Sequence, residues 1–264
     1  MRKGKVIAVL LAASVFMAFA LGSGSSSSST HDSVKVEPNG SSETTATTAD
    51  ANNETTADIE YEISDTNFEY YTNSIGVIEY YGYVEITNTG SCDIYMKDCV
   101  FDLEDNNGHL LQSDSFISHC PEVISPGEKG YFFNGIGSSS MDESISLDNG
   151  VNLVPQISLK KASGKPHSYP VSDVDFRAGD YGDVKVTGRV ENDTDEAKSY
   201  LSVYTIFRDG NGKVIAIDTT TVMSEVGPGN KGSFDSSTMF GNENLKLENI
   251  KDVEVICEDD YYQF

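Results

Sequence analysis

An internal repeat dominates this sequence, because the same succession of strand and turn signals occurs twice, roughly 100 residues apart. In each copy apolar residues alternate with polar ones over short runs, a period typical of strands with one buried and one solvated face. No stretch after Tyr61 has the apolar spacing of a helix. Three glycine pairs mark the repeat: Gly82 with Gly188, Gly108 with Gly212, and Gly127 with Gly229.

Turn signals separate the runs at intervals of about 8 to 12 residues. The segments Asp105–Gly108 and Asp209–Gly212 each combine Asp, Asn and Gly, which tolerate the backbone angles of tight turns. About seven short strands per copy is typical of an antiparallel sandwich of immunoglobulin type. The sequence therefore predicts an all-β chain of two tandem antiparallel immunoglobulin-like β-sandwiches, at 61–163 and 167–264, joined by a Gly/Pro/Ser linker.

The first 60 residues differ in composition from the rest. Residues 1–20 have a basic start, an apolar run and a small-x-small end at Ala18–Ala20, which predicts a signal peptide cleaved after Ala20. An uncleaved membrane anchor is the alternative, although the apolar run is short for a bilayer. Residues 21–60 contain no aromatic residue and 16 Ser or Thr, so we expect a disordered tether.

The formal charge of −24 disfavours any nucleic-acid partner, since an acidic surface repels phosphate backbones. Together with the export signal, the composition predicts an extracytoplasmic protein, either secreted or associated with the cell surface. Membrane contact is expected only through the signal segment, if that segment stays uncleaved.

One strand and its turn resemble a known family. The run Phe101-Asp102-Leu103-Glu104-Asp105 resembles the Phe-x-Leu-Tyr-Asp signature of the FxLYD domains, with Phe101, Leu103 and Asp105 matching and Glu104 replacing the tyrosine. The second copy keeps only Asp209 of the motif, although its surroundings resemble the family more closely. The resemblance implies an immunoglobulin-like extracytoplasmic domain without established activity, and it brings no catalytic residue.

Four cysteines in an exported chain permit disulfide bonds. Cys99 and Cys257 share strand faces with apolar residues and are expected to be small buried side chains. Cys92 and Cys120 flank loops of the first copy, so they are the preferred bridge. The alternative is that all four cysteines stay reduced.

Calcium is the one metal that the sequence suggests. Asp173, Asp175, Asp180 and Asp183 cluster around the first hairpin of the second copy, and such loops supply the oxygen ligands that Ca²⁺ prefers. The alternative is that these residues form turns and add solubility. No other cofactor and no catalytic constellation is indicated, so an enzyme is not expected.

Tyrosines lie on both faces of one predicted strand, at Tyr80, Tyr81 and Tyr83, so some must lie outside the core or cover an interface. The sequence therefore predicts a non-catalytic exported protein that binds an envelope protein or polymer through its two domains. A structural spacer without a specific ligand is the first alternative, and a hydrolase of envelope polymers is the second.

Overall fold

The computed structural model confirms an all-β protein with antiparallel sheets. None of the residues that it describes belongs to a helix long and apolar enough to cross a membrane. Apart from Val34–Lys35, the predicted signal peptide and most of the predicted tether lie outside the described residues. The structure describes residues 34–35, 59–73, 75–135, 139–179, 183–238 and 246–259.

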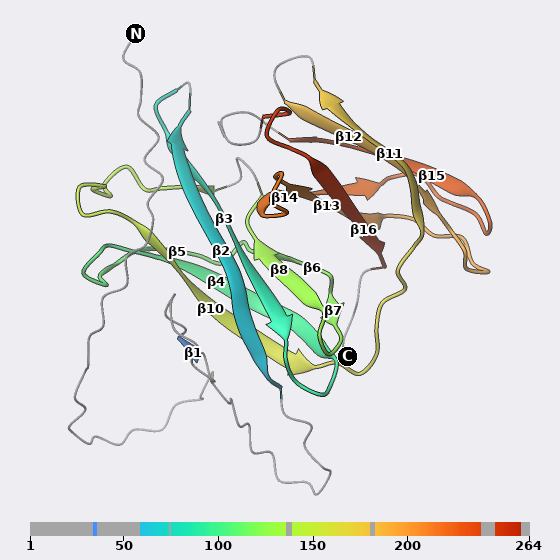
Figure 1. Ribbon diagram of the computed structural model, residues 1–264, viewed down its shortest axis with the longest axis horizontal. Coiled ribbons are helices and arrows are strands. Elements are labelled where there is room, and N and C mark those ends of the chain that lie inside the picture. The colour runs from blue at the N-terminus through green and yellow to red at the C-terminus, as the bar shows by residue number, and fades with distance from the viewer. Residues whose placement is uncertain are drawn as a thin grey trace, which may run out of the picture.

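Two sheets form from the first half of the chain (Figure 1). Sheet A contains, in spatial order, β1 (Val34–Lys35), β10 (Asn152–Lys161), β4 (Ile94–Glu104) and β5 (Leu110–Asp114), with β7 (Val123–Ile124) also paired to β4. Sheet B contains β2 (Tyr61–Thr72), β3 (Ile78–Asn88), β8 (Lys129–Phe133) and β6 (Ser118–Cys120), with β9 (Ser139–Ser140) also paired to β3.

Two further sheets form from the second half. Sheet C has the order β14 (Val214–Val222), β13 (Leu201–Arg208) and β16 (Asp252–Glu258). Sheet D has the order β11 (Val171–Ala178), β12 (Val184–Glu191) and β15 (Lys231–Thr238). The strand order of sheet C matches β5-β4-β10 of sheet A, and that of sheet D matches β2-β3-β8 of sheet B. This correspondence is what a duplication of one unit requires.

Apolar side chains form two cores. The first core lies between sheets A and B and includes Tyr80, Val84, Phe101, Leu103 and Phe132. The second core contains side chains of sheets C and D and continues onto the outer face of sheet B. Figure 1 accordingly shows the sheets in the order A, B, C, D. Sheet B is therefore covered on both faces.

Gly82 and Gly188 each allow close packing inside their own half, although the ladders correct their predicted pairing: Gly188 lies opposite Phe234 as Val84 lies opposite Phe132. A Cβ atom added at Gly82 would lie 2.8 Å from Cδ1 of Leu153, and one at Gly188 would lie 2.5 Å from the ring of Phe234. These distances are shorter than those of real Cβ contacts. The Leu153 and Phe234 side chains therefore occupy the space that a side chain at these two positions would need.

Replacing Gly188 with alanine is expected to lower the free energy of unfolding by about 1–3 kcal/mol, because the new methyl group overpacks against Phe234. Urea denaturation measures the change. Gly210→Ala is the matched control, since its Cβ would have the nearest atom at 3.6 Å. An equal loss in both variants would contradict this explanation.

Candidate interaction surfaces and the interface between the halves

The outer face of sheet B packs against sheet C through two fully buried tyrosines. The backbone N–H of Ile217 donates a hydrogen bond to the Tyr81 hydroxyl at 2.5 Å. The Tyr83 hydroxyl lies 3.0 Å from the carbonyl oxygen of Val214 and 2.6 Å from a carboxylate oxygen of Asp65. The hydrogen bonds to Ile217 and Val214 connect the two halves. Each tyrosine therefore joins the halves both by apolar contact and by a hydrogen bond.

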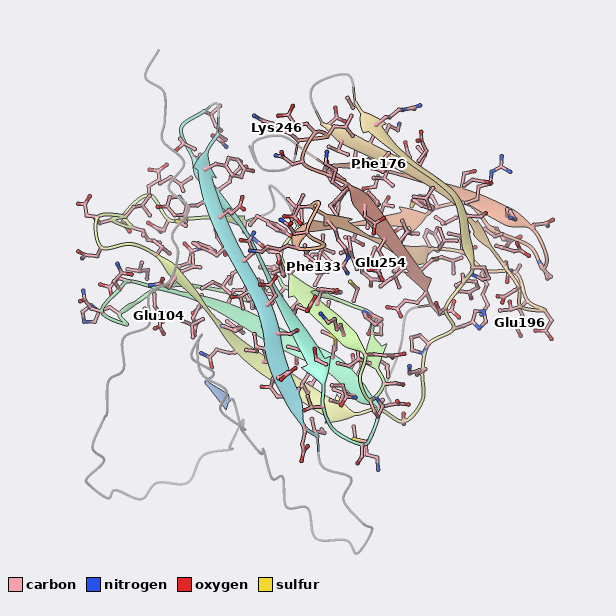
Figure 2. The ribbon with its side chains drawn as sticks, in the orientation of Figure 1. Glu104, Phe133, Phe176, Glu196, Lys246 and Glu254 are labelled. Atoms are coloured by element: carbon pink, nitrogen blue, oxygen red, sulfur yellow. The ribbon has the colours of Figure 1, made fainter. Side chains whose placement is uncertain are left out.

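A second set of contacts surrounds these tyrosines. The Arg208 guanidinium donates to the Tyr131 hydroxyl at 2.9 Å and to the Glu254 carboxylate at 2.8 Å. The rings of Phe133 and Tyr204 meet edge to face, with centroids 6.4 Å apart. Figure 2 shows Phe133 on the side of β8 that faces the second half. The interface therefore combines aromatic packing with a charged group at its margin.

Burial raises the pKa of Tyr81 and Tyr83 well above that of an ordinary phenol. Both hydroxyls accordingly stay protonated over the pH range in which proteins fold. Tyr80 points the opposite way and belongs to the first core. The tyrosines that the sequence singled out on this strand are thus used inside the molecule, two of them at an interface between its halves.

The motif residues have structural roles. Phe101 and Leu103 lie in the first core. The Asp105 carboxylate accepts hydrogen bonds from the backbone N–H groups of Asn107 at 2.8 Å and His109 at 2.9 Å. In the second half, Asp209 accepts from Asn211 at 2.8 Å and Lys213 at 3.0 Å. The two aspartates therefore close the same kind of turn, which the sequence predicted.

The pKa of Asp105 depends on the hydrogen bonds of this turn, so a titration tests the turn geometry. The backbone N–H of His109, followed by that of Asn107, lowers the pKa of Asp105 from 3.8 to about 2. An NMR titration of its carboxyl group is expected to give a midpoint near that value. Because the pKa falls on folding, this group stabilises the fold above pH 3.8 and loses that contribution as the pH falls toward 2. A midpoint at the ordinary value would contradict the turn geometry.

Two buried asparagines, Asn88 and Asn192, make equivalent hydrogen bonds in the two halves, and the sequence analysis did not identify them. The Asn88 side-chain amide donates to the carbonyl oxygens of Cys92 at 2.8 Å and Ile124 at 3.0 Å. Asn192 donates to those of Glu196 and Val226, both at 2.7 Å. The signal that was available is the shared separation of 104 residues, the same as for Asp105 and Asp209.

The predicted calcium residues are not gathered into one group. Asp173 lies 3.8 Å from the Arg189 guanidinium, and Asp183 accepts a hydrogen bond from the Ser237 hydroxyl. Asp175 lies on β11 opposite Thr187, and Asp180 lies outside the described residues. Among the residues that are described, no three or more acidic, histidine or cysteine side chains are placed to hold a metal ion.

The structure corrects the predicted cysteine bridge. Cys92 and Cys120 are both buried thiols, as are Cys99 and Cys257. The Cys120 side chain lies in the second core, on the interface between the halves, whereas Cys92 follows β3 and belongs to neither core. Burial raises the pKa of Cys120 well above that of an ordinary thiol, so it is held as an apolar group.

Large apolar side chains are exposed on and beside β5. Leu110 is 60% exposed and Phe116, just beyond β5, is 88% exposed. A shallow depression beside the same strand has apolar residues in its lining, with the Gln112 side chain tying the strand to the carbonyl oxygen of Ser140 at 2.9 Å. We name the two exposed residues, Leu110 and Phe116, the β5 patch.

Another exposed pair lies at the end of sheet C. Tyr200 and Met223 are 64% and 72% exposed and flank the paired residues Leu201 and Val222. Tyr200 also has a φ of 59°, an uncommon backbone conformation for a bulky residue. Tyr200 and Met223 are thus a second exposed apolar pair, on the second half.

Comparison with protein-family models gives no match, and comparison with curated proteins gives none either.

Proposed function

We propose that this chain is a non-catalytic, exported envelope protein that binds a partner through the surface of two tandem immunoglobulin-like domains. The observation that carries the proposal is the β5 patch, in which Phe116 and Leu110 expose large apolar side chains on and beside β5, a strand that also carries the polar residues Gln112 and Ser113. Exposed apolar surface rimmed by polar groups is typical of sites that contact another molecule.

The matching parts of the two halves support the tandem arrangement. Both halves have the same sheet order, the same aspartate-closed turn and the same buried asparagine. The FxLYD resemblance of Phe101, Leu103 and Asp105 fits this arrangement, because those residues lie in the core and turn that define the unit. The family would then describe the fold of each domain and leave the partner to be identified.

The distribution of buried polar groups supports a binding role over catalysis. Asp114 is buried, and its carboxylate accepts hydrogen bonds from the hydroxyls of Tyr80 and Ser139, both at 2.6 Å. The Glu258 carboxylate accepts the backbone N–H of Glu122 at 2.8 Å. These carboxylates hold loops and strands together, and neither belongs to the β5 patch.

The test places a photo-crosslinking amino acid at Phe116 in cells that make the protein. One dominant adduct is expected, because a binding surface meets one partner far more often than it meets abundant neighbours. The matched control carries the same group at Asn211, an exposed turn residue of the second half. Phe116→Ala, with the crosslinker moved to Leu110, should lose the adduct.

The same adducts at Phe116 and Asn211 would contradict the proposal and favour a spacer without a specific ligand. An unchanged adduct in the Phe116→Ala chain would show that Phe116 does not contribute to the contact.

A further inference from the structure

In the second half, a segment of the chain covers the outer edge of β16. The Tyr169 N–H donates to the carbonyl oxygen of Cys257 at 2.8 Å, and the Asp259 N–H donates to that of His167 at 3.1 Å. Ser168 bridges Glu258 between these two bonds. The segment His167–Tyr169 directly precedes β11, so the chain protects this edge before it enters sheet D.

The corresponding strand of the first half is β10. Ile157 pairs with Cys99 on β4, and Cys257 pairs with Val203 on β13. Since β4 and β13 are equivalent strands, with Asp105 and Asp209 following them at a separation of 104 residues, Cys99 corresponds to Val203. Ile157 is therefore the counterpart of Cys257, next to which Tyr169 lies.

The first half protects this edge differently. Its leading strand β2 is already in sheet B from its first residue, where Tyr61 pairs with Asn88. Residues equivalent to His167–Tyr169 are therefore held by β3 and do not reach β10. In the described part of the chain, the strand on this edge is β1, with Val34 opposite Ile157 and Lys35 opposite Gln156. Figure 1 shows β1 beside β10.

We propose that the outer edge of β10 is a strand-acceptor site whose occupant is the chain's own segment Val34–Lys35. An uncovered strand edge presents backbone N–H and C=O groups that pair with any extended segment. Val34 takes the position that Tyr169 takes in the second half. In both halves, an earlier segment of the chain therefore pairs with the backbone groups on the equivalent strand edge. The run Val34-Lys35-Val36 has the alternation of a strand.

Docking in this way divides the predicted tether. The pairing at Val34–Lys35 leaves 13 residues, 21–33, between the predicted cleavage site and β1, in place of the 40 residues of the predicted tether. A flexible chain of 40 residues has an r.m.s. reach of roughly 35 Å, whereas 13 residues reach roughly 20 Å. A tether paired in this way would therefore reach less far from the folded halves than an unpaired one.

Hydrogen exchange of the β10 peptide, residues 152–161, tests the proposal in the chain that begins at Leu21. Val34→Pro removes a backbone donor and is incompatible with the pairing, so amides of this peptide should exchange several-fold faster. Thr45→Pro is the matched control, because it places proline in the same tether outside β1 and should leave the exchange unchanged. The exchange of β13 should be the same in all three chains.

A synthetic peptide of residues 33–38, added in excess to the Val34→Pro chain, should restore slow exchange if the edge accepts strands. Unchanged exchange in the Val34→Pro chain would overturn the proposal. Protection that rises with protein concentration, together with a dimer in sedimentation, would also overturn it by assigning the edge to a second copy. None of these results depends on a partner at the β5 patch, so the two proposals fail separately.

Discussion

Replacing Tyr81 with alanine is expected to lower the free energy of unfolding by about 3–5 kcal/mol, the range for deleting a large buried aromatic side chain. Tyr81 is fully buried between sheets B and C, and its hydroxyl accepts the N–H of Ile217. The variant loses apolar contact with the second half and leaves that N–H without its bond. Urea denaturation, followed by tyrosine fluorescence and by circular dichroism, measures the change.

The control for this variant is Thr187→Ala, on the outer face of sheet D at the position equivalent to Tyr83, where the change is expected to stay within about 0.5 kcal/mol. Tyr81→Phe separates the two contributions, because it keeps the ring and removes only the hydroxyl. A loss below 1 kcal/mol for Tyr81→Ala would show that the interface contributes little to folding.

Removing either buried asparagine is the second large effect. Asn88→Ala and Asn192→Ala are each expected to cost about 1–3 kcal/mol, because each removes a buried amide that donates two hydrogen bonds to backbone carbonyl oxygens. The two variants should lose similar amounts, since the two side chains make equivalent bonds. Thermal and urea unfolding of the purified variants measure both losses.

Asn211→Ala is the matched control, because the Asn211 side chain is exposed and interacts with Asp209 inside its own turn. Its stability should stay close to that of the unmodified chain. If Asn88→Ala is neutral while Asn192→Ala is destabilising, the equivalent asparagine hydrogen bonds do not contribute equally to the stability of the two halves.

Local signals in the sequence predicted the parts of the fold that neighbouring residues determine. Alternation predicted strands such as Val184–Glu191, and the Asp-x-x-Gly runs predicted the turns at Asp105 and Asp209. Burial of Phe101 and Leu103 followed from the same alternation. These features depend on a few adjacent residues, so a single sequence is enough to predict them.

Contacts between distant segments could not be predicted in this way. Tyrosines on both faces of β3 indicated that some lay outside the core or covered an interface, but nothing local identified sheet C as the contact. The Cys92–Cys120 bridge was wrong because sequence position does not reveal that Cys120 lies on that interface. The pairing of Val34–Lys35 with β10 spans more than 120 residues and has no short-range signal.

The contact between sheets B and C has a consequence for assembly. It joins dissimilar faces of two similar units, and a contact of this kind can in principle add unit after unit into a fibre. Sheet D is the face that a third unit would meet, and there ion pairs such as Lys185–Asp235, at 2.9 Å, take the place of an aromatic surface. Sheet D therefore offers a further unit no surface like the one that joins sheets B and C. The positions equivalent to Tyr81, Tyr83, Tyr131 and Phe133 in the strand ladders hold Lys185, Thr187, Ser233 and Asp235.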